Sequence, residues 1–95
     1  MSLCTASRAT PPGPLIHIRH GFTAVCATFL LAVETDANGW MAQVRSRDDD
    51  RAIYSAERWS LSAAKVAATE FALLSSGNNT DPEWAARQLR WREYW

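Results

Sequence analysis

Residues 22–46 read FTAVCATFLLAVETDANGWMAQVRS, and this stretch decides the fold. From Phe22 to Thr35 both alternating sets of positions are largely apolar, which predicts one long strand inside a sheet that is covered on both faces. Asp36-Ala37-Asn38-Gly39 then predicts a tight hairpin turn, because Asn and Gly tolerate positive φ angles. Trp40 to Ser46 alternates between apolar and polar residues, so the next strand is expected to bury one face.

Further elements are predicted on both sides of this stretch. Leu15 to His20 and Ala52 to Arg58 are expected to form the outer strands of a meander. Ser60 is a suitable cap for a helix over Leu61 to Ser75, whose alanine-rich face can lie close to a sheet. A last helix is expected from Pro82 to the end of the chain. The predicted fold class is α+β, a four-stranded antiparallel meander packed by one helix and followed by a C-terminal Trp-rich helix, in the order β-β-β-β-α-α.

Length and composition limit the possible functions. The 95 residues are enough for one domain, which we place at residues 15–95, behind a flexible N-terminal arm at residues 1–14. Ten basic and ten acidic residues give a net charge of zero, so no long-range field attracts nucleic acid or a membrane surface. The longest apolar stretch is too short to span a bilayer, so no membrane partner is expected. Cys4 and Cys26 are expected to be free thiols, which suits a cytoplasmic protein.

The sequence holds no pattern typical of a catalytic, metal or cofactor site. His17 and His20 are three apart in a predicted strand and therefore face opposite sides, so they cannot easily share a metal ion. Asp48-Asp49-Asp50 lacks the ligand spacing of a calcium loop. We therefore expect no cofactor, no metal and no enzymatic activity. A small thiol-dependent enzyme using Cys26 with His20 is the second alternative, although a thiol in an apolar strand has a raised pKa and little reactive thiolate.

One helix segment carries a resemblance to a known family. Residues 64–73 read AKVAATEFAL, and this pattern resembles the final helix of double-stranded RNA-binding domains, which follows three antiparallel strands. The resemblance implies a sheet-plus-helix unit of the same kind. The chain departs from the family at the helix start, where Leu61 and Ser62 stand in place of lysines and only Lys65 is kept. Because that basic cluster grips phosphates in the family, the departure argues against RNA binding.

The C-terminal segment is the most informative for function. On a helix, at about 100° per residue, Trp84, Trp91 and Trp95 fall within about 40° of each other. Arginines and a tyrosine interleave with these rings, and such residue types are enriched at protein–protein hot spots. The predicted contact residues are Trp84, Arg87, Arg90, Trp91, Tyr94 and Trp95.

Two interpretations of this Trp stripe remain open. In the first, the stripe covers Val66 and Leu73 of the preceding helix and completes the core of the monomer. In the second, it contacts a protein partner or a second copy of the chain, and we base the functional prediction on it. The predicted function is a small non-enzymatic interaction module that acts through protein–protein contact or as a homodimer. The first alternative is a nucleic-acid-binding module. Its basic residues would be Arg45, Arg47, Arg51, Lys65 and Arg87.

Overall fold

The computed structural model describes residues 20–37, 39–48 and 51–95. Its elements in chain order are β1 (Gly21–Cys26), β2 (Phe29–Asp36), β3 (Gly39–Ser46), β4 (Ala52–Arg58), α1 (Leu61–Ser75), α2 (Pro82–Gln88) and β5 (Arg92–Tyr94). The strands form one antiparallel sheet in the order β4-β3-β2-β1-β5. The predicted α+β class is confirmed, with a four-stranded meander, one packing helix, a second short helix and an additional C-terminal strand. The predicted arm at residues 1–14 and residues 15–19 of the first predicted strand lie outside the described residues.

The predicted single strand from Phe22 to Thr35 is wrong, because the chain turns back at Ala27 and Thr28. The two halves pair with each other as β1 and β2, with Cys26 opposite Phe29. Ala27 adopts a φ of +56°, a left-handed conformation that tight two-residue hairpins require. The segment contains no Gly, Asn or Pro at this point, so the usual sequence signals of a turn are absent.

This turn also explains why both alternating sets of positions are apolar. Across a two-residue turn, each even-numbered residue of β1 lies opposite an odd-numbered residue of β2. The even-numbered residues of β1 therefore share a face of the sheet with the odd-numbered residues of β2. The shared set is Phe22, Ala24, Cys26, Phe29, Leu31 and Val33. Large apolar side chains are thereby collected on one face of the hairpin, and this face is the one that α1 covers.

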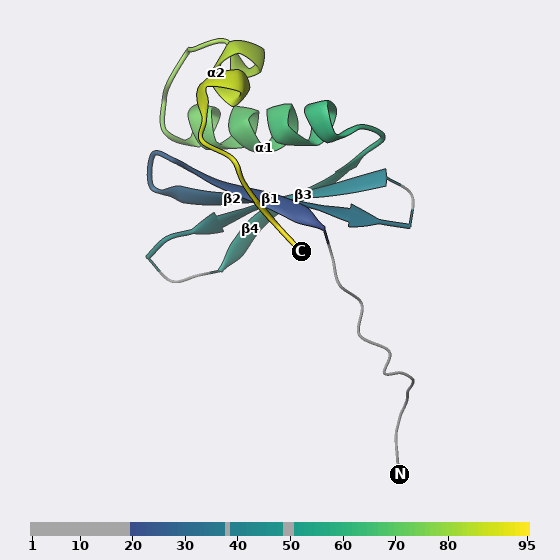
Figure 1. Cartoon of the computed structure of the whole chain (residues 1–95). Coiled ribbons are helices and arrows are strands. Elements are labelled where there is room, and N and C mark those ends of the chain that lie inside the picture. The colour runs from purple at the N-terminus through teal and green to yellow at the C-terminus, as the bar shows by residue number, and fades with distance from the viewer. Residues whose placement is uncertain (1–19, 38, 49–50) are drawn as a thin grey trace.

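The core lies between this face and α1 (Figure 1). Leu31, Val33 and Val44 are completely buried on the sheet side. On the helix side the buried residues are mostly alanines, whose small side chains let α1 lie close to the strands. Ser60 caps the helix as predicted, since its side chain accepts a hydrogen bond from the Ala63 amide at 3.1 Å.

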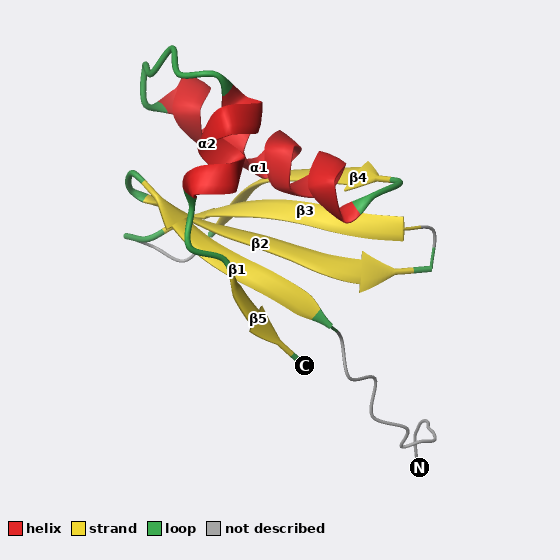
Figure 2. Ribbon diagram, turned by 45° about the horizontal axis from the view of Figure 1, so that its top comes forward, coloured by secondary structure: helices red, strands yellow, loops and turns green. Residues whose placement is uncertain are grey.

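The other face of the sheet is not covered by any described element. Both helices lie on the same side of the sheet, with α2 above α1 (Figures 1 and 2). Val25 is 50% exposed on the open face, and Leu30 and Ala32 are partly exposed there. The expectation that residues 22–35 are covered on both faces is therefore not met within the described part of the chain.

The predicted helix from Pro82 to the end of the chain is also wrong, because α2 ends at Gln88. Leu89 leaves the helix with φ −70° and ψ 151°, and the chain continues as β5 beside β1. Side-chain hydrogen bonds also hold this extended segment. The Trp91 Nε1 atom donates to the Ala86 carbonyl at 2.8 Å, and the Tyr94 hydroxyl donates to the Glu34 carboxylate at 2.5 Å. Pairing with β1 therefore overrides the helical pattern of the sequence.

Candidate protein-contact surface

Five aromatic rings gather on the helix side of the sheet, at the end of β1 where His20 precedes Gly21. We call this set, His20, Phe22, Trp40, Trp91 and Trp95, the aromatic surface. The His20 ring lies between three of the others, with its centroid 5.1 Å from Phe22, 5.9 Å from Trp40 and 4.0 Å from Trp95. The Phe22 and Trp40 centroids are 6.2 Å apart. Such separations are typical of interacting aromatic pairs, so these four rings form a connected layer.

Lys65 of α1 joins Trp91 to this layer. Its ammonium nitrogen lies 4.5 Å from the centroid of the Phe22 ring and 5.2 Å from that of Trp91. Both distances are within the range of cation–π attraction. The positive charge is therefore held between two rings.

A groove of about 510 Å³ continues from Lys65 between α1 and α2. Val66 and Ala86 provide apolar lining, and Arg87 and Glu83 of α2 provide one charge of each sign. Together with Lys65 and Trp91, these residues form an amphipathic depression beside the aromatic surface. The lining therefore offers both apolar and charged groups to a bound side chain.

Trp91 and Trp95 have different environments within the aromatic surface. Trp91 is partly buried, packs against the core and is fixed by its hydrogen bond to Ala86. Trp95 is 75% exposed although it stacks on His20 with an interplanar angle of 8°. His20 also pairs with the carboxylate of Glu93. Trp95 therefore offers nearly a whole indole to solvent from a defined position.

The six predicted contact residues do not form one stripe, because the helix that was to carry them ends at Gln88. Trp84 lies on α2 and is 52% exposed. Arg87 and Trp91 line the groove between the helices, whereas Arg90 lines a different groove beside β1. Tyr94 lies opposite Gly21, so by register the Tyr94 side chain points to the face of the sheet away from α1. Trp95 stacks on His20.

Sequence reasoning missed the neighbours of Trp95. His20, Phe22 and Trp40 come together through the register of β1, β2 and β3, and that register depends on the unsignalled turn at Ala27. It also missed Trp59, which is 88% exposed just before α1. No sequence feature distinguishes Trp59 from a core tryptophan.

The interpretation in which the Trp stripe completes the monomer core is only partly met. Leu73 is buried in the same cluster as Ala85 of α2, so α2 covers this part of α1 with small residues. Of the three C-terminal indoles, only Trp91 packs against that core, because Trp84 and Trp95 are mostly exposed.

The residues considered for thiol chemistry are far apart. Cys26 is 8% exposed at the turn end of β1, and burial raises the pKa of its thiol. His20 lies at the opposite end of the same strand, about 20 Å away at roughly 3.4 Å per residue. Cys26 and His20 therefore do not form a nucleophile–base pair. His17 and Cys4 lie outside the described residues.

The basic residues of the nucleic-acid alternative do not share one face. Arg45 pairs with Leu30, so by register it points away from α1. Lys65 and Arg87 line the groove on the opposite, helix-covered side. These residues therefore do not form a continuous basic surface.

Two further features are absent from the described residues. No group of three or more His, Cys, Asp or Glu side chains is arranged to hold a metal ion in the described part of the chain. Among the helices of residues 20–37, 39–48 and 51–95, none is long and apolar enough to cross a membrane. In comparisons with known proteins, no family model, no curated protein and no solved structure matches this chain.

Proposed function

We propose that this chain is a non-enzymatic protein-interaction module, and that its aromatic surface makes the contact. The observation that carries the proposal is the exposure of Trp95, which keeps 75% of its area accessible while stacked on His20. Tryptophan contributes more binding energy at interfaces than most residues, and it does so best when its position is already fixed. The stacked ring meets both conditions.

The partner that we propose is a second copy of the chain. The net charge is zero, so two copies have no long-range repulsion. The contact region also holds both signs of charge, since Lys65 and Arg87 are basic and Glu83 and Glu93 are acidic. A two-fold interface brings the same patch of each copy together, and a patch with both signs can be complementary to itself.

Sedimentation velocity over a range of concentrations tests this proposal. We expect the wild type to form a dimer and Trp95→Ala to weaken dimerisation at least tenfold. Trp59→Ala is the matched control, because it removes an even more exposed indole outside the aromatic surface. The control should dimerise like the wild type. A wild type that stays monomeric at every concentration, or equal weakening by both variants, would contradict the proposal.

A further inference from the structure

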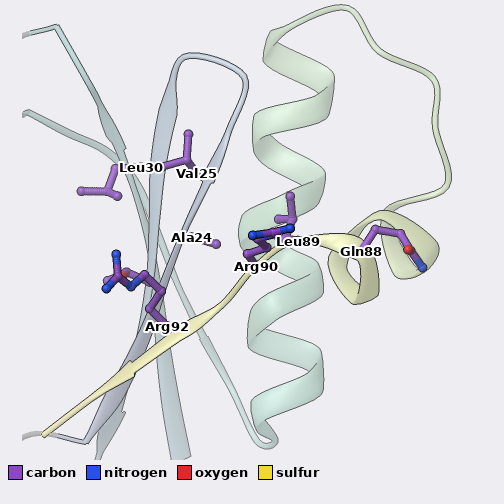
Figure 3. A pocket seen from close by; sticks show the side chains of 8 residues that line it. Ala24, Val25, Leu30, Gln88, Leu89, Arg90 and Arg92 are labelled. Carbon is purple, nitrogen blue, oxygen red and sulfur yellow. The ribbon is translucent and has the colours of Figure 1, made fainter.

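A second groove lies beside β1, and its position follows from the short length of β5. β5 pairs with β1 only from Gly21 to Thr23, whereas β1 continues to Cys26. Before β5, the chain at Leu89 and Arg90 runs toward α2 and away from β1 (Figure 3). A groove of about 560 Å³ fills the space between the strand and this connection.

The backbone of β1 presents hydrogen-bonding groups to this groove. The Thr35 amide donates to the His20 carbonyl at 3.0 Å, which fixes the alternation of the β1–β2 ladder. The backbone N–H and C=O groups that point toward β2 are therefore those of Phe22, Ala24 and Cys26. The backbone groups that point toward the opposite edge of β1, where β5 pairs, are those of Gly21, Thr23 and Val25. Tyr94 and Arg92 of β5 lie opposite Gly21 and Thr23, but β5 has no residue opposite Val25. The N–H and C=O of Val25 are therefore directed toward the groove.

The side chains around the groove are apolar, neutral polar (Thr23 and Gln88) or positively charged. Val25 and Leu30 lie on the β1–β2 hairpin, and Leu89 and Arg90 lie on the facing connection (Figure 3). Arg90 and Arg92 are both exposed, and no ion pair within the described residues involves either one. The lining contains no Asp or Glu side chain. The groove therefore combines an open strand edge, an apolar floor and two positive charges that lack a counter-charge in the described structure.

We propose that this groove binds an extended, acidic segment of a protein partner, which continues the sheet beside Val25. An added strand gains main-chain hydrogen bonds from an open edge, and its alternate side chains fill neighbouring pockets. Alternate side chains on one face of a strand are about 7 Å apart. Arg90 and Arg92 have the same two-residue spacing, so carboxylates at alternate positions of the segment can each meet one guanidinium. An apolar residue elsewhere in the segment packs against Leu30 and Leu89.

This site is separate from the aromatic surface and does not depend on the proposed dimer. Arg92 and Val25 point by register to the sheet face away from α1, while Phe22 and Trp40 point toward it. The occupant differs as well, because the groove favours an acidic strand and the aromatic surface favours a second copy of the chain. Failure of one proposal therefore leaves the other unaffected.

Titration of the full-length, isotope-labelled chain with short synthetic peptides tests the proposal. The probe is an N-acetylated, C-amidated peptide of alternating Glu and Val, and Lys replaces Glu in the control peptide. We expect only the Glu peptide to shift the Val25 amide resonance and to slow the hydrogen exchange of that amide. A version of the Glu peptide with N-methylated backbone amides should bind at least tenfold more weakly, because it cannot donate to the strand edge.

Protein variants separate specific binding from general attraction of anions. The double variant Arg90→Gln/Arg92→Gln should lose at least tenfold in affinity for the Glu peptide. Arg58→Gln, at the end of β4 and outside this groove, should bind like the wild type. Free glutamate at the same concentration should leave the Val25 amide unchanged. Equal binding of the Glu and Lys peptides, an unaffected Val25 amide, or equal effects of free glutamate and peptide would overturn the proposal.

Discussion

Trp91 and Trp95 are four positions apart, yet the structure gives them different tasks. Trp91 is partly buried against the core and donates from Nε1 to the Ala86 carbonyl, so it joins the end of α2 to β5. Trp95 makes a single ring stack and remains 75% exposed. Burial therefore separates an indole that stabilises the monomer from one that is available for contact.

Substitution of these tryptophans should affect the free energy of unfolding very differently. We expect Trp91→Ala to lower it by about 2 kcal/mol, through lost packing and a lost hydrogen bond. Trp84→Ala, at a 52% exposed position, should lower it by less than about 1 kcal/mol. Urea denaturation followed by circular dichroism measures both values. Equal losses would show that Trp91 is not a structural residue.

The Cys26 thiol should be unreactive in the folded protein. It is 8% exposed, and burial raises its pKa, so the thiolate is scarce near neutral pH. In a Cys4→Ser background, we expect a thiol reagent to modify Cys26 slowly until urea unfolds the chain. Because the pKa of Cys26 is raised in the folded protein, the free energy of unfolding should be unaffected below the ordinary thiol pKa. It should fall as the pH rises through the pKa that Cys26 has in the folded protein. Rapid modification in native buffer would instead support the thiol-enzyme alternative.

At the scale of elements, the β1–β2 hairpin shows where sequence reasoning fails and why. The strands β3 and β4 and the helix α1 were predictable with nearly correct bounds, because each has a clear periodicity and a clear start or stop. The turn between β1 and β2 has no such signal, since Ala27 adopts a positive φ without being Gly or Asn. β5 was missed because its conformation depends on pairing with β1, which is distant in sequence.

Replacement of Ala27 by glycine should stabilise the hairpin. A left-handed alanine costs about 1–2 kcal/mol, and glycine removes that strain while adding some entropy to the unfolded chain. We expect Ala27→Gly to raise the free energy of unfolding by about 0.5–1 kcal/mol. Ala37→Gly is the matched control, because Ala37 directly follows β2 in the connection to β3 but has no positive φ. Urea denaturation compares the two variants, and loss of stability in both would contradict the account.

At the scale of the whole molecule, the fold class could be predicted from the sequence, but the arrangement of the aromatic rings could not. The helical wheel grouped Trp84, Trp91 and Trp95, and this grouping is wrong because α2 ends at Gln88. The layer that does form around His20 needs residues from β1, β3 and the chain after β5. Such a layer depends on strand register, which a pattern along the chain does not contain.

The five indole N–H resonances offer the most direct test of contact through the aromatic surface. We would record them by NMR while the concentration of the full-length chain rises from about 10 μM to about 1 mM, a range that covers weak dimers. We expect the Trp95 and Trp40 signals to shift or broaden with concentration, while the Trp59 signal stays unchanged. Five signals that do not respond to concentration, or a response confined to Trp59, would contradict it.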